Sequence, residues 1–307
     1  MLFSLSTDAL VKIYEDMEAA DIKLASAGEF TDDACAIADN LEQGDQLNFL
    51  GANKEKIEFR KGELTVLAGA SGHGKSALMG QIALDLIRQG KKVCILSLEM
   101  PSGRTLWRMA RIEYGYKVCG RMPQYVNIAG DTTEAFCKSV DKNLLLLNKV
   151  GSAIPNEVFG AMVKAKSEGC EFIIIDNLMR VCPEYGDRAN ELQKEFIQNL
   201  IALTKRFDFH TFLVHHVRKG ASETEEINKY SIRGAAAITD NADNVLLFSR
   251  NISKEKKMAD ADETARKLID HDEADNILVV DKQRNGEWQG TIPFWYDKEH
   301  MSFRPNF

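Results

Sequence analysis

One short run of residues constrains this chain more than any other feature. It reads Gly69-Ala70-Ser71-Gly72-His73-Gly74-Lys75-Ser76 and lies between an apolar stretch at 64–68 and an amphipathic stretch at 76–89. The run matches the pattern GxxxxGK[ST], in which backbone N–H groups of a glycine-rich turn surround a polyphosphate. Lys75 then reaches the outer phosphates, and the Ser76 hydroxyl binds Mg²⁺. We assign all eight residues to nucleotide binding, since the flanking strand and helix disfavour a chance glycine-rich turn.

The size and composition of the chain suit one main domain. Its 307 residues are 44% hydrophobic and 28% charged, so the chain can bury a full α/β core with room for appendages. No stretch approaches the roughly 18 consecutive apolar residues of a membrane span, and the first residues lack the pattern of a secretion signal. We therefore expect a cytoplasmic protein without membrane contact.

The charge and the cysteines narrow the chemistry further. The net charge of −7 argues against a protein that coats duplex DNA by bulk attraction, although it leaves room for a local nucleic-acid channel. The six cysteines form no CxxC pair, and several lie in apolar patterns. Reduced, buried thiols are therefore favoured over a zinc site.

Residues 1–50 differ from the rest of the chain and are assigned to a helical N-terminal arm and linker. Thr7 and Thr31 are suited to cap two helices, and the apolar residues of each helix fall near one face. Either the adjoining domain or a neighbouring subunit must cover these residues, and both alternatives stay open. They are Leu10, Tyr14, Met17 and Leu24 in the first helix and Cys35, Ala38 and Leu41 in the second.

Residues 51–307 are assigned to a single α/β domain, because apolar strands alternate with amphipathic helices. Strands are expected at 64–68, 93–98, 144–147, 172–175, 211–214 and 245–249 and from 277 onward, and helices at 76–89, 106–114, 158–166 and 191–205. Near-continuous apolar strands indicate a sheet that helices cover on both faces. The expected fold is a mostly parallel central sheet flanked by helices, with ligands at the carboxyl ends of the strands.

Two carboxylates follow strands of this predicted sheet. Glu99 comes directly after the strand at 93–98 and is suited to activate a water in line with the outer phosphate, although it would also suit the cap of a helix after Pro101. Asp176 ends the apolar run at 172–175 and is the expected partner of Mg²⁺.

Two histidines follow the strand at 211–214. Strand alternation sends the side chains of His215 and His216 to opposite faces, so at most one points at the phosphates. We favour His216 as the group that senses the outer phosphate. A metal site is disfavoured, because the chain has six histidines and no HExxH spacing.

The order of these pieces resembles that of a known family. The segments GASGHGKS, ILSLEMP, FIIIDNL, VHHVRKG, SIRGAAAITDNAD and DKQRNG are similar to successive motifs of DnaB-type replicative helicases, including phage helicase-primases and mitochondrial Twinkle. The resemblance covers residues 51–304 and implies a RecA-like P-loop NTPase that uses ATP or another NTP with Mg²⁺. It also implies Glu99 as the water-activating base, Asp176 as the support of Mg²⁺ and His216 as the phosphate sensor.

The same resemblance implies that subunits share their sites. It assigns Lys282 and Arg284 to the nucleotide of a neighbouring subunit, where a guanidinium offsets charge on the transferred phosphoryl group. It also places Arg250 near the nucleotide. Hydrolysis would then need a homo-oligomer, and a hexameric ring is what the family implies. Without the resemblance, a solvated hairpin is the simpler interpretation of Lys282 and Arg284.

The resemblance places single-stranded DNA in a central channel. It assigns the DNA contacts to Arg233, Gly234 and Ala236, with Arg218 and Lys219 nearby. Small residues let backbone N–H groups reach phosphate oxygens without reading the base sequence. Bacterial members carry an acidic residue and a serine where this chain has Gly234 and Ala235, so the details of the contact differ.

Two further charged segments have simpler interpretations. Arginines and lysines alternate with aromatic residues over 104–121 and are suited either to stack single-stranded DNA or to pack the aromatic residues inward, which we favour. The charged stretch at 253–275 is expected to be a solvated or mobile loop.

The favoured function is an ATP-dependent replicative DNA helicase that translocates on single-stranded DNA as a ring and unwinds duplex DNA. The alternative is a RecA-like ATPase or helicase-derived accessory factor that binds DNA without processive unwinding. The chain has neither the amino-terminal collar of bacterial DnaB proteins nor a zinc-bearing primase, so we expect a compact phage- or plasmid-type protein of a bacterial host. Its arm would bridge subunits, and a primase or helicase loader is an expected partner.

Overall fold

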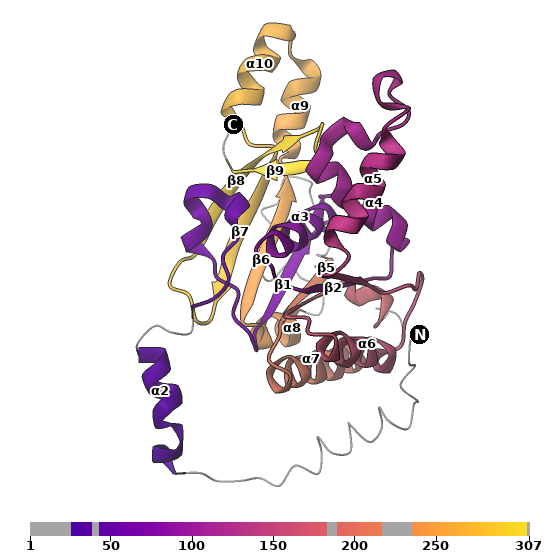
Figure 1. The fold of residues 1–307 in the computed structure, drawn as a ribbon. Coiled ribbons are helices and arrows are strands. Elements are labelled where there is room, and N and C mark those ends of the chain that lie inside the picture. The colour runs from indigo at the N-terminus through magenta and orange to yellow at the C-terminus, as the bar shows by residue number, and fades with distance from the viewer. Residues whose placement is uncertain (1–25, 39–42, 183–188, 217–234, 306–307) are drawn as a thin grey trace.

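A single sheet organises the chain. The computed structural model describes residues 26–38, 43–182, 189–216 and 235–305, and nine strands within these residues form one sheet in the order β3-β2-β4-β5-β1-β6-β7-β8-β9 (Figure 1). Neighbouring strands from β3 to β6 run parallel, and β7, β8 and β9 add in antiparallel fashion, so the expected mostly parallel sheet is confirmed. The strands are β1 (Leu64–Gly69), β2 (Val93–Ser97), β3 (Leu144–Leu146), β4 (Phe172–Asp176), β5 (His210–His216), β6 (Asn244–Arg250), β7 (Asn276–Gln283), β8 (Gly290–Asp297) and β9 (Ser302–Arg304).

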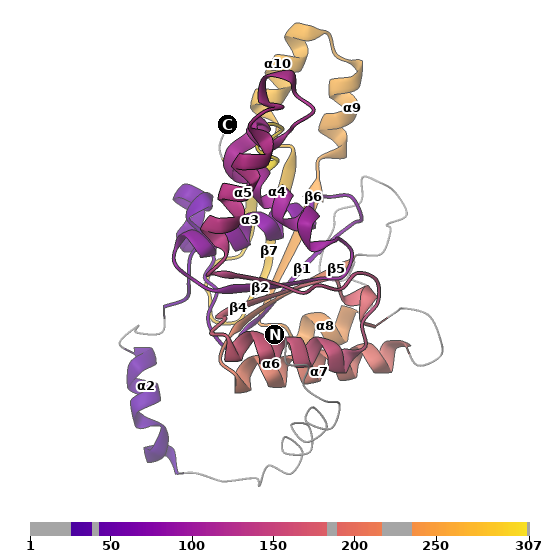
Figure 2. The same cartoon turned by 45° about the vertical axis from the view of Figure 1, so that its right-hand side comes forward.

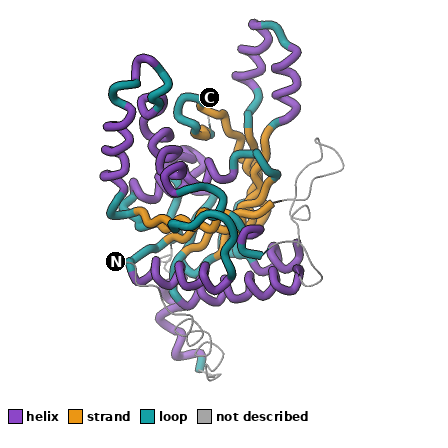
Figure 3. The backbone as a smooth tube through the Cα atoms, turned by 90° about the vertical axis from the view of Figure 1, so that its right-hand side faces the viewer, coloured by secondary structure: helices purple, strands orange, loops and turns teal. Residues whose placement is uncertain are grey.

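Helices cover both faces of the sheet. One face packs against α3 (Lys75–Arg88), α4 (Ser102–Tyr114) and α5 (Ala129–Val140), and the other against α6 (Pro155–Ser167), α7 (Ala189–Arg206) and α8 (Ala235–Asn241) (Figure 2). The tube drawing shows the strands between these two helical layers (Figure 3). Outside the layers, α9 (Ile252–Asp260) and α10 (Glu263–Asp272) form a hairpin, and α2 (Thr31–Ala38) lies away from the body (Figure 1).

The apolar strands explain the two layers. In β4, Phe172 and Ile174 join the core beneath α3 and α4, whereas Ile173 and Ile175 join the core against α6 and α7. Because successive side chains of a strand point to opposite faces, a strand that is buried on both faces needs an unbroken apolar run. The near-continuous apolar strands of the sequence are therefore confirmed as the centre of the sheet.

The parallel arrangement also brings four strand ends to one edge. The register places Gly69 of β1 beside His216 of β5, and Ser97 of β2 beside Asp176 of β4. The segments that follow these strands therefore meet at the carboxyl edge of the sheet, where ligands bind in open α/β sheets.

The charged stretch at 253–275 corrects the sequence analysis, since it is not a loop but the hairpin of α9 and α10. Asn251 caps α9 by accepting a hydrogen bond from the N–H of Lys254 at 3.0 Å, and Asp262 caps α10 by accepting from the N–H of Ala265 at 2.8 Å. Lys254 is only 1% exposed and pairs with Asp270 at 3.0 Å and with Asp275 at 2.7 Å. These caps and the two ion pairs of the buried Lys254 order a segment whose composition alone suggested a solvated loop.

The described part of the arm contains an exposed segment around α2 and a later segment that packs into the body. Leu47 and Leu50 are buried in the core of the body, whereas Phe30 and Ile37 beside and within α2 are exposed. Thr31 does not cap α2 as predicted, because a 3₁₀ turn at Ala27–Phe30 precedes it and the Thr31 hydroxyl donates to the Gly28 carbonyl at 2.9 Å. The helix expected after Thr7 lies outside the described residues.

The basic and aromatic segment after β2 packs inward, as favoured. Trp107 and Tyr114 of α4 pack against the core, and the Trp107 indole N–H donates to the Val118 carbonyl at 2.9 Å. Arg111 is only 7% exposed. The segment therefore contributes to packing on this side of the sheet.

The cysteines are free thiols in the described residues. Cys94, Cys170 and Cys182 are buried as predicted, and burial raises the pKa of the Cys170 and Cys182 thiols to about 11. Cys35 is exposed. Within the same described residues, every helix is too short or too polar to cross a bilayer.

A fully buried histidine, His210, begins β5. Its Nδ1 lies 2.7 Å from the Arg60 carbonyl and its Nε2 lies 2.9 Å from the Thr65 hydroxyl. A neutral ring satisfies both contacts, because Nδ1–H donates to the carbonyl and Nε2 accepts from the hydroxyl. Phe59 and Phe212 pack around the ring, and this burial lowers the pKa of His210 to about 4.

We predict that His210 makes the fold sensitive to mild acid. Its pKa in the folded chain lies below the ordinary 6.5, so its contribution is complete above about pH 6.5 and is lost as the pH falls toward 4. Urea unfolding should show about 2 kcal/mol of this contribution lost between about pH 7 and pH 5. The variant His210→Gln, which does not titrate there, is the control. Equal pH dependence of the two proteins would contradict this assignment.

Candidate nucleotide-binding site

The glycine-rich loop connects β1 to α3 at the carboxyl edge of the sheet. A Cβ atom on Gly69 would lie 2.2 Å from the Phe248 carbonyl oxygen of the neighbouring strand β6, so a side chain is excluded at this position. Gly74 has a φ of +95°, a left-handed conformation that favours glycine, and it is the N-cap residue directly before α3. The loop therefore turns sharply from strand to helix, as the motif predicts.

Lys75 closes this loop on itself. The side chain is buried, and its Nζ donates to the carbonyls of Gly69 at 2.8 Å and Ala70 at 2.9 Å. Burial lowers the pKa of Lys75 to about 8, against the opposing charges of Asp176 and Glu99. The amine that the motif assigns to phosphate oxygens is thus bound by the loop carbonyls in this structure. A bound polyphosphate would compete with these carbonyls for Lys75.

The residues assigned to Mg²⁺ lie together and suit the ion. Asp176 is 4% exposed and accepts a hydrogen bond from Ser76. Its Oδ1 atom is buried without a hydrogen-bond partner, and burial raises the pKa of this carboxyl group. A buried carboxylate oxygen beside a hydroxyl is the hard oxygen ligand set that Mg²⁺ prefers, and a cation there would satisfy the unpaired atom.

Glu99 and His216 also converge on the loop. His216 Nδ1 lies 3.3 Å from Lys75 Nζ, while the neighbouring His215 is fully buried. The side chain of Glu99 is 36% exposed, so water can reach it. The structure therefore brings Lys75, Asp176, Glu99 and His216 to one place, as the strand-end argument predicts.

Two residues at this site were missed by the sequence analysis. Asn177 is 1% exposed, and its Nδ2 donates to Glu99 Oε1 at 2.7 Å and lies 3.1 Å from His216 Nε2. Arg180 Nε lies 3.8 Å from Glu99 Oε1. The signal for Asn177 was its place directly after Asp176, at the same strand end.

A cavity of about 970 Å³ opens beside the loop. Its lining includes the loop residues Gly72 and His73 and the aromatic residues Trp295 and Tyr296 of β8. Arg250, assigned to the nucleotide, also lines it, and its backbone N–H donates to His73 Nδ1 at 3.2 Å. The Arg250 guanidinium pairs across the cavity wall with Glu255 of α9 at 2.6 Å.

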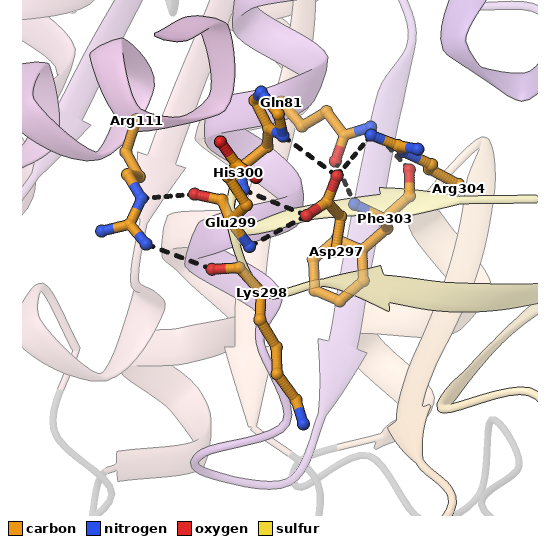
Figure 4. A network of polar contacts seen from close by, with 8 residues as sticks. All are labelled: Gln81, Arg111, Asp297, Lys298, Glu299, His300, Phe303 and Arg304. Atoms are coloured by element: carbon orange, nitrogen blue, oxygen red, sulfur yellow. Dashed lines mark hydrogen bonds and ion pairs between the residues drawn. The ribbon is translucent and has the colours of Figure 1, made fainter. Parts of the chain in front are cut away.

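The turn between β8 and β9 forms a further wall of this cavity and is fixed to the helices of the body (Figure 4). Arg111 of α4 donates to the carbonyls of Lys298, at 3.2 Å, and Glu299. Gln81 of α3 and Phe303 exchange two hydrogen bonds of 2.8 Å. The helix that begins at the loop is therefore tied directly to the opposite wall of the cavity.

Lys282 and Arg284 lie at the other end of the sheet. β7 runs antiparallel to β6, so Asn276 pairs with Arg250 near the loop, whereas Lys282 pairs with Val245. At roughly 3.3 Å per residue, the five steps of β6 from Val245 to Arg250 separate Lys282 from the level of Arg250 by about 16 Å. The structure does not bring the two cations to the loop of their own chain.

Both cations have partners within the chain. Lys282 Nζ donates to the carbonyls of Thr239 at 3.0 Å and Ala242 at 2.7 Å at the end of α8. Arg284 pairs with Asp243 at 3.1 Å. Of the residues assigned to DNA, Arg218, Lys219, Arg233 and Gly234 lie outside the described residues, and Ala236 lies within α8.

Comparisons with known proteins agree with this geometry. The family model described as AAA domain matches residues 57–222, which is more than half of the chain. A solved ATPase domain of another protein superposes with a TM-score of 0.70 at 16% sequence identity, over 98% of each chain. A DnaB-like replicative helicase, solved to show its interactions with primase, gives a TM-score of 0.70 at 15% identity over 98% of this chain and 68% of that one.

The expected RecA-like architecture is therefore confirmed, and the resemblance to DnaB-type helicases is confirmed at the level of the fold. The glycine-rich loop and the residues that converge on it lie within the matched segment. This chain belongs to the AAA domain family of P-loop NTPases and has the fold of DnaB-like helicase ATPase domains.

Proposed function

We propose that this chain is the motor of an ATP-dependent DNA helicase, which translocates on single-stranded DNA as a homo-oligomeric ring and unwinds duplex DNA. The observation that carries the proposal is the division of the assigned residues between two ends of the sheet. Lys75, Glu99, Asp176 and His216 gather at the loop, whereas Lys282 pairs with Val245, about 16 Å along β6 from Arg250. A site that needs both sets of residues must combine two chains.

The residues at the loop suit hydrolysis of a nucleoside triphosphate, with ATP as the proposed substrate. Lys75 and the loop N–H groups would bind the outer phosphates, and Ser76 with Asp176 would hold Mg²⁺, which supplies positive charge to the phosphates when bound. Glu99 would take a proton from the attacking water, and His216 would contact the outer phosphate. The cavity beside Trp295 and Tyr296 has room for the base and ribose.

The neighbouring subunit would complete this site. Arg284 and Lys282 stand at the end of the sheet that faces away from their own loop, and there a ring would present them to the next nucleotide. A guanidinium supplied in this way stabilises the transferred phosphoryl group and raises the rate by a factor on the order of 10³–10⁵. We propose a hexamer, which is the ring that the resemblance to DnaB-type helicases implies, and a closed ring satisfies head-to-tail contacts between identical chains.

The DNA contacts are assigned to Arg218, Lys219, Arg233, Gly234 and Ala236. Arg218 and Lys219 come within three residues of His216, so a change at the outer phosphate would reach these two DNA contacts through a short piece of chain. Each subunit would bind weakly and the ring would add its contacts together. The part of the arm at 1–44 would bridge subunits, and a primase or a helicase loader is the proposed protein partner in the cytoplasm of a bacterial host.

We predict that two substitutions at the site both lower hydrolysis but differ in their effect on nucleotide binding. Lys75→Ala should lose nucleotide binding and hydrolysis, because it removes the cation that reaches the phosphates. Glu99→Gln should keep nucleotide affinity but lower turnover by roughly 10²–10⁴ fold, because it removes the base. Fluorescent-nucleotide titration and phosphate release measure the two effects. Rapid hydrolysis by Glu99→Gln would remove Glu99 from its role.

Strand separation tests the helicase activity itself. Single-stranded DNA should stimulate hydrolysis, and the protein with ATP should release a labelled strand from a forked duplex. The Glu99→Gln variant with ATP is the control for release caused by binding alone. Stimulated hydrolysis without release of the strand would favour the accessory ATPase that binds DNA without unwinding.

Mixing two inactive variants tests the shared site. Arg284→Ala and Lys75→Ala should each be inactive, yet a mixture should recover part of the activity. Some interfaces in the mixed ring then contain an intact Lys75 from one chain and an intact Arg284 from the next. Titration of one variant into the other, followed by phosphate release, measures this recovery. Failure to recover activity at every ratio would contradict a composite site.

A further inference from the structure

Asn177 occupies the position between two residues to which the proposed function gives separate roles. Its side-chain nitrogen donates to Glu99 Oε1 at 2.7 Å and lies 3.1 Å from His216 Nε2. A carboxylate only accepts hydrogen bonds, so the contact with Glu99 requires the amide nitrogen, not the oxygen, to point this way. With its two hydrogens, one amide nitrogen can bind the carboxylate and the imidazole at the same time.

Two hydrogen-bond donors, Lys75 and Asn177, compete for the imidazole of His216 in this structure. A neutral ring has one nitrogen that accepts and one that carries a hydrogen. Lys75 lies 3.3 Å from Nδ1, and Asn177 lies 3.1 Å from Nε2. While a charged Lys75 donates to Nδ1, the Nε2 atom carries the hydrogen and cannot accept from Asn177. The two hydrogen bonds to the ring therefore exclude each other.

A bound polyphosphate would resolve this competition. Lys75 now donates to the carbonyls of its own loop, and phosphate oxygens would draw it away from them and from His216. Nδ1 of His216 can then carry the hydrogen and donate it to a phosphate oxygen, and Nε2 becomes the acceptor for Asn177. Arrival of the outer phosphate thus strengthens the bond between His216 and Asn177.

We infer that Asn177 is a positioning residue that holds the carboxylate of Glu99 in one orientation and ties it to the phosphate-sensing ring of His216, so that arrival of the outer phosphate strengthens this connection to the base. This inference rests on the proposed roles of Glu99 and His216. Held at Oε1 by Asn177, the Glu99 carboxylate keeps one orientation, and its other oxygen receives the proton of the attacking water. Arg180, at 3.8 Å from Oε1, adds charge on the same side.

Burial supports a fixed bridge and not a surface contact. Asn177 is 1% exposed, so its amide has few other partners, and its Oδ1 atom is buried without a hydrogen-bond partner. A buried polar atom that is left unpaired destabilises the fold, and such atoms persist mainly at functional sites. The chain keeps this unfavourable arrangement beside the water-activating carboxylate.

The test is a double-mutant cycle on the full chain with ATP and single-stranded DNA. Asn177→Ala should lower kcat roughly 100-fold, because a misplaced base loses alignment, while KM and nucleotide affinity change less than about threefold. In the Glu99→Gln background, which has no base to align, the same substitution should change kcat less than about threefold. Asn177→Ser, which keeps one donor, should recover part of kcat and serves as the second variant if Asn177→Ala does not fold.

Asn244 supplies the matched control. It is also 1% exposed, and it donates to Glu63 at 3.0 Å and to Thr65 at 3.1 Å at the first residue of β6, away from the loop edge. Asn244→Ala should lower the unfolding midpoint yet keep kcat within about twofold of the unchanged chain, which shows that loss of a buried amide alone does not stop turnover.

Three results would overturn the inference. They are unchanged kcat in a folded Asn177→Ala, an equal fold-loss in the Glu99→Gln background, and a loss of nucleotide affinity as large as the loss of kcat. Failure of the proposed function is recognised separately, because the unchanged chain would then show no hydrolysis stimulated by single-stranded DNA.

Discussion

The register of the parallel strands is the constraint on which the rest of the structure depends. It sets Gly69 beside His216 and Ser97 beside Asp176, so residues far apart in sequence meet at one edge. Parallel register needs long crossovers, and the helices that provide them cover the sheet and exclude water from both cores. A shift of one residue in any central strand would turn its inward side chains outward and separate the loop from the carboxylates.

The nucleotide edge is also connected to the outer part of the molecule. The walls of the cavity come from α9 and from the β8–β9 turn, and each is anchored by buried polar contacts rather than by apolar packing alone. Lys254 ties α9 to Asp275, and Gln81 ties α3 to Phe303. The helix that begins with Lys75 therefore shares contacts with the wall that would enclose the base of a nucleotide.

Sequence patterns predicted the central strands closely, because a short unbroken apolar run such as the one at 172–175 is typical of a strand that helices cover on both faces of the sheet. They also placed Glu99, Asp176 and His216 at strand ends. They failed for α9 and α10, since a charged composition hides the order that two capping residues and the buried Lys254 create. They also missed Asn177, because no pattern tells a buried amide from an exposed one.

The sequence by itself determined the phosphate-binding loop, the alternation of strands and helices and the residue types at the strand ends, because these depend on local geometry and on periodic apolar positions. Only the tertiary structure decided which of those residues touch, that Asn177 joins Glu99 to His216, and that Lys282 stands at the far end of the sheet from its own loop. Contacts between strands depend on pairing order and register, and these follow from the packing of the whole chain and not from any one segment.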